Sequence, residues 1–502
     1  MQGAASNVES FRRPRAAITP AILLACAMGM GGCAAVGPDF VRPTAPPATR
    51  YTRDTLHAED ASKGDTQHIA LGHEIEGNWW TLFQSNAIEL VVKQALESNR
   101  SLVASMATLA QAQEFALARA GSQYPQVDLS AAAGRQQYGK EFLGPIGIPP
   151  FTYFAVGPTV SYTLDYTGGV ARGVEQQYAL AEVEQHQRDA AYLTVTGQAV
   201  MQTLVIASVR AQIDTVEIIL LQDRDNLQLV QSAFDNGSVA REDVVSAQSQ
   251  IANDMTLLPP LRQDLAKARH ALSVVLGRAP ASELPDDVGL GQITLPLQLP
   301  VSLPSELAHR RPDILAAEAR LHAATSAVGV AQSNLYPKIQ LSASAGQQSL
   351  KADQLFDRAG NAWSIVSGLT APIFDGGTLR AEKRVAVDAM RASAATYEQT
   401  VLEAFAQVAD LLEGLDHDAE QLDAQDHAQQ AAQSSLELAR ISYKEGNAGV
   451  LRVLDAERSY QQARLGYVRA VAQRYLDTVQ LFLALGGTSP TSQPHSEPTH
   501  VL

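Results

Sequence analysis

The sequence predicts an α+β fold in which one large unit, a strand pair followed by a long antiparallel helical hairpin, occurs twice. Residues 124–134 and 336–346 align without a gap at an offset of 212, and each runs from a Tyr-Pro pair into alternating small and apolar residues. A second strand-like segment, a glycine pair and a long stretch without proline follow each of them. Similarity on this scale indicates an internal repeat.

The composition favours long packed helices and disfavours several functions. The 502 residues are 46% hydrophobic but only 6% aromatic, a bias that suits helices better than a β-sandwich. A formal charge of -15 argues against a nucleic-acid partner, because phosphate binding needs clustered basic residues. The sequence also lacks the zinc-protease, nucleophile-elbow, phosphate-loop and dinucleotide patterns, so we expect no enzyme activity.

The first 32 residues have the pattern of a lipoprotein signal peptide. Arginines precede an apolar segment that is too short to span a membrane, and Gly31-Gly32 stands before Cys33. Cys26 is a competing site, but the apolar region before it is short and contains Pro20. We therefore expect a covalent lipid on Cys33, no other cofactor, and no disulfide in the mature chain.

Residues 33–76 are rich in proline at first and then polar, and they predict an extended leader. The folded part is expected to open at Trp79-Trp80. A helix is expected over about 86–120, and it must end before Tyr124-Pro125 because the residue preceding proline disfavours helical geometry.

Four segments alternate with a period of two and predict strands. They are about 126–137 and 151–166 in the first half of the chain, and 338–349 and 363–374 in the second. In the first of them Val127, Leu129 and Ala131 share one face, whereas Asp128 and Ser130 share the other.

Helical patterns without proline then cover residues 170–234 and 378–443, and glycine turns at Gly237 and Gly446 end them. Helices return after each turn, the first one with Pro259-Pro260 inside its pattern. The sequence predicts six segments in order: signal peptide 1–32, leader 33–76, first repeat 77–278, linker 279–303, second repeat 304–487 and disordered tail 488–502.

Four strands are too few to close a barrel, for which about eight is the practical minimum. Alternating strands beside a lipid anchor nevertheless suggest an outer-membrane barrel. Three chains would supply twelve strands and leave no free edge, and the helices would extend this wall into a tube.

Five motifs carry a resemblance to a known family: CAAVGPDF at 33–40 with Arg42-Pro43, WWTLF at 79–83, RRPDI at 310–314 continuing to 321, Tyr336-Pro337, and APIFDGG at 371–377. Over residues 33–487 the chain resembles the TolC-like outer-membrane efflux lipoproteins. The run RRPDI is the most specific of these motifs.

The resemblance implies a homotrimeric, lipid-anchored channel in the outer membrane. Its twelve-stranded barrel, four strands from each chain, would continue into a coiled-coil periplasmic tunnel that docks to a periplasmic adaptor and an inner-membrane RND-type pump. The implied function is the exit channel of a tripartite efflux pump for drugs or other toxic small molecules. A duct for type I protein secretion is the alternative, and a coiled-coil scaffold without a pore fits the four strands poorly.

The resemblance also implies a gate at the periplasmic end. The family pattern there is aromatic-x-x-Gly, with Leu five and Asp nine residues after the glycine, and this chain has Tyr443, Gly446, Leu451 and Asp455. Leu451 and Asp455 share one helix face. In a trimer they would form an apolar constriction and an anionic ring, which we expect to hold the pore shut and cation-selective.

The supporting residues of this gate differ in part from the family pattern. Asp243, six residues after Gly237, stands where the family has an acid that can bond the aromatic of the other turn, here Tyr443. Ala448 and Arg452 stand where some relatives carry an Arg and a second Asp, so the ring is expected to carry less charge.

Two further patterns have structural interpretations. Asp416-His417-Asp418 with His427 could bind a metal, but a solvated charge run on a helix is the favoured reading, and no metal site is expected. Arg310-Arg311-Pro312-Asp313 predicts a helix start, with proline in the first turn and an acid near the positive end of the helix dipole.

Overall fold

The computed structural model describes residues 35–44, 48–52, 67–139 and 148–486. The predicted signal peptide, the tail, Cys26 and Cys33 lie outside these residues. The chain divides into two compact units. Unit 1 comprises the described residues up to Phe40, Leu117–Gln176 and Ala324–Asp388, and unit 2 comprises the rest, so that each unit takes segments from both halves of the sequence.

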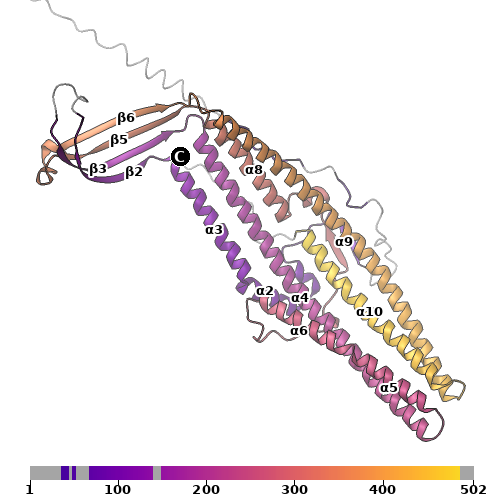
Figure 1. Ribbon diagram of the computed structural model, residues 1–502. Helices are drawn as coiled ribbons and strands as arrows, with labels where there is room; N and C mark the ends of the chain where they lie inside the picture. The colour runs from indigo at the N-terminus through magenta and orange to yellow at the C-terminus, as the bar shows by residue number, and fades with distance from the viewer. Residues whose placement is uncertain (1–34, 45–47, 53–66, 140–147, 487–502) are drawn as a thin grey trace, which may run out of the picture. The chain divides into compact units, whose positions relative to one another are not determined.

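Unit 1 contains a four-stranded antiparallel sheet in the order β2-β3-β5-β6 (Figure 1). Its strands are β2 (Gln126–Gln136), β3 (Phe151–Leu164), β5 (Lys338–Ser349) and β6 (Asn361–Thr370). β2 and β6 are the edge strands of this sheet as described, and each exposes a row of backbone donors and acceptors.

Three of these strands lie within two residues of their predicted bounds, but β6 does not. It was expected over 363–374, whereas it covers Asn361–Thr370. Pro372 lacks the N–H that a ladder needs, so pairing ends before it. Asp375 then accepts the N–H groups of Gly377 at 2.8 Å and Leu379 at 2.9 Å, and α9 (Thr378–Lys444) begins.

A close backbone approach interrupts the ladder between β3 and β5. A Cβ on Gly157 would lie 2.6 Å from the Cα of Gly346, so only glycine fits there. Pairing resumes at Thr159 opposite Ser344, beyond Pro158, which has no N–H to donate.

The helices are long and follow the predicted pattern, with one correction. The expected helix over 86–120 is two helices, α2 (Asn86–Ser98) and α3 (Arg100–Ala120). Asn99 separates them, because its side-chain oxygen accepts the N–H groups of Ser101 and Leu102 and so caps α3.

Two helical hairpins dominate unit 2 (Figure 1). α4 (Gly169–Asp235) turns into α5 (Arg241–Met255) and α6 (Leu258–Val275), and α9 turns into α10 (Val450–Ala484). Pro259 and Pro260 fall in the first turn of α6, where a missing N–H costs no helical hydrogen bond. The shorter α7 (Pro304–Leu307) and α8 (Pro312–Ser333) precede β5.

A small parallel sheet in unit 2 joins the predicted leader to the predicted linker. β1 (His68–Leu71) pairs with β4 (Gln298–Val301), more than 200 residues away. Shortly after β1 in sequence, the 3₁₀ helix η2 (Trp79–Phe83) buries Trp79 and Phe83 against Phe482, with ring centroids 5.8 and 6.2 Å from that of Phe482. Among the described helices, none is both long and apolar enough to cross a membrane.

Candidate functional site

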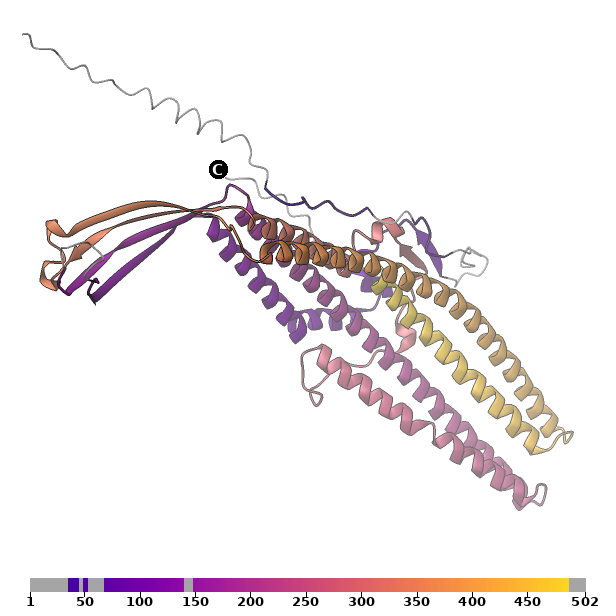
Figure 2. The same cartoon turned by 45° about the horizontal axis from the view of Figure 1, so that its top comes forward.

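The turns of the two hairpins lie at the same end of unit 2 and are built alike (Figures 1 and 2). Gly237 and Gly446 have φ angles of 71° and 75°, a left-handed conformation that favours glycine. Each N–H bonds to the carbonyl three residues earlier, and the following N–H reaches five residues back, from Ser238 to Ala233 and from Asn447 to Ser442, at 2.8 Å in both. This is the Schellman pattern, which ends a helix and reverses the chain.

Asp243 caps its own helix. Its Oδ2 accepts the N–H of Ala240 at 3.0 Å, so the carboxylate lies at the positive end of α5. Tyr443, the aromatic residue expected to be its partner, is half-buried and packs against the apolar side chains of both hairpins. The turns are therefore joined by an apolar cluster around Val230, Val244 and Val450.

Leu451 and Asp455 lie on the exposed face of α10, one helical turn apart. Leu451 is 51% exposed, and the side chain of Asp455 is 68% exposed. Between them Val453 is buried, and Ala456 follows on the same inner side. In the single chain both predicted gate residues thus face away from the hairpin core, where a symmetry-related chain or a pore could reach them.

Asp455 has a charged partner within its own helix. Arg458, three residues further along α10, donates from its Nη2 to Asp455 Oδ1. The guanidinium is always charged at physiological pH, so the two groups form an ion pair. The sequence interpretation considered the carboxylate alone and missed this arginine, although the i, i+3 spacing was visible.

A buried polar layer lies behind this exposed face. Glu457 is 1% exposed and accepts hydrogen bonds from Arg440 of α9, at 3.1 Å, and from Asn226 of α4. One turn further, Gln461 donates to Asp223 of α4 at 2.9 Å. These contacts cross-link the two hairpins, and they were not predicted, because a buried acid cannot be told from a surface acid without its partners.

Burial and a second acidic residue both raise the pKa of Asp223. Desolvation, together with the neighbouring carboxyl of Asp254 in α5, raises the pKa of Asp223 from 3.8 to about 7. Close by, a cavity of about 580 Å³ is lined by residues of α4, α9 and α10, among them Asn226, Arg440 and Tyr443.

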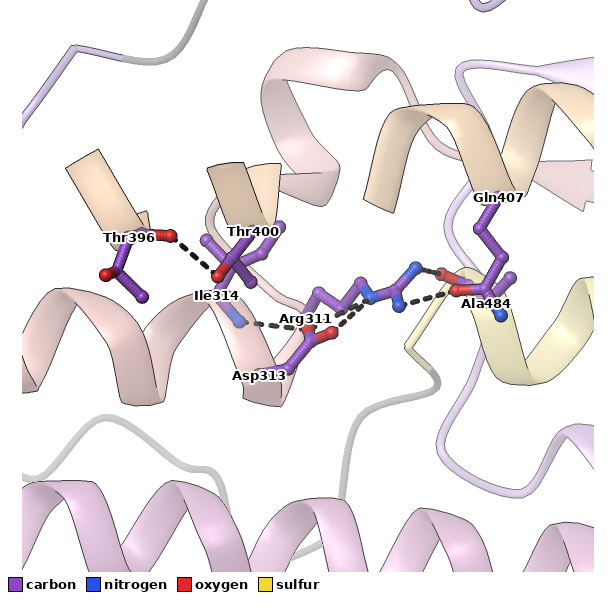
Figure 3. Close-up of polar contacts among 7 residues, drawn as sticks. All are labelled: Arg311, Asp313, Ile314, Thr396, Thr400, Gln407 and Ala484. Carbon is purple, nitrogen blue, oxygen red and sulfur yellow. Dashed lines mark hydrogen bonds and ion pairs between the residues drawn. The ribbon is translucent and has the colours of Figure 1, made fainter. Parts of the chain in front are cut away.

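The RRPDI motif starts α8 as predicted and also binds two other helices (Figure 3). The Arg311 Nε donates to both oxygens of Asp313, at 2.9 and 3.1 Å. Its Nη1 donates to the carbonyl of Ala484, the last residue of α10, at 3.0 Å, and its Nη2 donates to Gln407 of α9 at 2.6 Å. One guanidinium thus holds the start of α8, the end of α10 and the middle of α9, and the neighbouring Arg310 pairs with Glu74.

The residues just after the predicted lipidation site make specific contacts inside unit 1. The N–H of Val36 bonds to the carbonyl of Thr167 at 2.9 Å, and Asp39 forms an ion pair with Arg172. Gly37, with φ of 101°, packs on Gly329 so closely that a Cβ would lie 2.5 Å from its Cα. The start of the predicted leader is thus fixed to helices rather than free.

The histidines weighed as metal ligands lie on an exposed helix face. His417 faces Glu420 and His427 faces Asp423, both at 3.5 Å within α9. Within the described ranges, no group of three or more His, Cys, Asp or Glu side chains is placed to hold a metal ion.

The comparisons with known proteins identify the class of this fold. The sequence matches the outer membrane efflux protein family over residues 91–278 and 303–487. The chain belongs to this family.

Individual relatives align over nearly the whole chain. Pyoverdine export outer membrane protein OpmQ of Pseudomonas putida is 28% identical over 422 residues, which cover 83% of this chain and 89% of OpmQ. Probable outer membrane lipoprotein SilC of Salmonella typhimurium is 26% identical, over 91% and 96% of the two chains. The solved outer-membrane channel OprN is 28% identical and has a TM-score of 0.82, covering 90% of this chain and 99% of OprN.

Proposed function

We propose that the protein is the outer-membrane exit channel of a tripartite efflux pump and conducts drugs or other toxic small molecules passively from periplasm to exterior. The observation that carries this proposal is the family match over most of the chain, together with relatives that are named as outer-membrane export and efflux proteins. The partners would be a periplasmic adaptor and an inner-membrane pump of RND or another type.

The channel is proposed to be a homotrimer with a twelve-stranded barrel. The edge strands β2 and β6 support this, because a four-stranded sheet cannot close and open edges are not stable in lipid. β6 of one chain would pair with β2 of the next. The helical hairpins would line a periplasmic tunnel, and segments 77–278 and 304–487 are proposed as the two repeats.

The periplasmic end is proposed as the gate, with Leu451 and Asp455 at the constriction. Their exposed positions just beyond the Gly446 turn support this role, as does the clustering of both hairpin turns around Tyr443. Gly237 and Asp243 would act by shaping the turn between α4 and α5 and capping α5. Cys33 is proposed to carry the lipid anchor, and the name of SilC as a lipoprotein supports this.

The test is purification from outer membranes followed by two measurements. Mass photometry should give a trimer, and planar bilayers should show single-channel conductance from the same fraction. A stable monomer with full strand content, or a trimer without conductance, contradicts the proposal. Deletion of the gene should sensitise cells to small toxic compounds, whereas loss of a secreted protein without such sensitivity would favour the protein-secretion alternative.

A further inference from the structure

The exposed face of α10 near the turn carries more positive than negative charge. Helical periodicity places Leu451, Asp455 and Arg458 on one side, and Arg452 borders them. All four side chains are exposed, while Val453 between them is buried. A pore that reaches Leu451 and Asp455 must therefore also reach at least one of these two arginines.

The ion pair removes most of the field of the Asp455 carboxylate. Its Oδ1 accepts the Arg458 guanidinium, and the opposite charges of a close pair largely cancel at the distance of a passing ion. Arg452 stands three residues before Asp455, so the single carboxylate lies between two guanidinium groups. Arginine keeps its charge at every physiological pH.

The turn before α10 does not restore a negative charge. Lys444 and Glu445 are both exposed, and their opposite charges cancel. Glu457 is 1% exposed and bonded to Arg440, so it points away from this face. Among the exposed residues from 444 to 458, three cations oppose two carboxylates. One net positive charge remains for each chain, and three for a trimer.

We propose that the periplasmic constriction of this channel favours anions, because Asp455 is neutralised by Arg458 and flanked by Arg452. The proposal rests on the channel function proposed above and adds the class of solute that passes most readily, small organic anions. Rings of arginine select anions in pores, whereas rings of free carboxylates select cations. The proposed anion preference differs from the cation-selective ring that was expected from Asp455 alone.

The test measures the reversal potential of purified trimers in planar bilayers under a potassium chloride gradient. The wild type should be anion-selective. Arg458→Gln should release the carboxylate and lower the chloride-to-potassium permeability ratio by roughly two- to fivefold, the size expected for one charge in a high-dielectric pore. Asp455→Asn should raise that ratio.

The double variant Asp455→Asn with Arg458→Gln tests whether the two charges offset each other. It removes both members of the pair and keeps the net charge, so its selectivity should stay near that of the wild type. Arg464→Gln is the matched control, since this half-buried residue lies on the opposite side of α10, and it should leave the ratio unchanged.

Two results overturn the inference. A wild-type channel that prefers potassium, or an Arg458→Gln channel with unchanged selectivity, means that the paired arginine does not set the field at the constriction. Absence of conductance in any trimer instead refutes the channel function and the inference with it. The two failures are therefore distinguished by whether current flows.

Discussion

At the scale of single residues, Arg311 is the residue of the RRPDI motif whose side chain bonds to the most helices. Its side chain is 14% exposed, and its three nitrogens bond to α8, α9 and α10. The carbonyl of Ala484 belongs to the last turn of α10, where no helical donor is available, so the guanidinium serves as its cap. A planar fork is needed for these diverging contacts, and lysine offers only a point charge.

Arg311→Lys should therefore destabilise the protein. The hydrogen bond to the Ala484 carbonyl is partly buried and the one to Gln407 is exposed, so losing both should cost about 1.5 to 3 kcal/mol in total. Thermal unfolding in detergent should show a clear drop in midpoint. Arg310→Lys is the control, because its pair with Glu74 is partly exposed and contributes little. Equal midpoints for the two variants would contradict this assignment.

Leu451 gives a second prediction at the residue scale. Leu451→Ala should widen the proposed constriction and raise single-channel conductance, and the effect should grow when Asp455→Ala is added. Leu438→Ala in α9 is the control, since Leu438 is also exposed, at 65%, but lies before the turn. If the Leu451 and Asp455 double variant conducts like the wild type, the gate lies elsewhere.

At the scale of elements, each hairpin contains a pair of neighbouring acidic residues, one on each of its two helices. Asp223 of α4 faces Asp254 of α5, and Glu457 and Gln461 of α10 complete its surroundings. In the other hairpin, Asp418 of α9 meets Asp477 of α10, near Arg474. Burial first, and the neighbouring carboxyl second, raises the pKa of Asp418 from 3.8 to about 7, as for Asp223.

These shifts predict a loss of stability as the pH rises. Between pH 3.8 and about 7 the folded protein holds a proton on each raised carboxyl that the unfolded chain has released. The free energy of unfolding therefore falls over this range and levels off above it. Midpoints from thermal unfolding in detergent should be higher at pH 5 than at pH 8.

Asparagine at these positions mimics the protonated acid. Asp223→Asn and Asp418→Asn should each stabilise the protein at pH 8 by on the order of 1 kcal/mol, with little change at pH 4. The control Asp410→Asn alters an exposed acid of α9 and should leave the pH profile intact. If the unfolding midpoint depends on pH in the first two variants as it does in the wild type, protonation of these two acids does not contribute to stability.

At the scale of the whole molecule, anchoring and assembly are separate requirements. The lipid is proposed on Cys33, while residues 36–39 are already fixed to unit 1 through Thr167, Arg172 and Gly329. Cys33→Ser should abolish fatty-acid labelling, and Cys26→Ser should not. Trimers should still form in the Cys33→Ser variant, because strand pairing rather than the lipid would close the proposed barrel. Labelling that survives Cys33→Ser would place the anchor elsewhere.

The sequence alone determined the parts of this protein that depend on local rules. Alternation of period two located the four long strands, the absence of proline located α4 and α9, and glycine located both hairpin turns. The helix start at Pro312 followed from the same reasoning. Each of these depends on backbone preferences within a few residues, so a single sequence contains the information. The end of β6 was misplaced because the apolar run continues past Pro372, where the ladder cannot.

The tertiary structure decided which distant groups meet. The pairing of β1 with β4, the partners of Arg311 on α9 and α10, and the buried bonds of Glu457 and Asp223 join segments that lie far apart in the chain. No local pattern distinguishes a buried acid from an exposed one, because the difference lies in desolvation and in the partners that packing brings. The exposure of Asp455 was settled in the same way, by which face of α10 the hairpin leaves uncovered, whereas its partner Arg458 lies three residues further along the same helix and follows from local spacing.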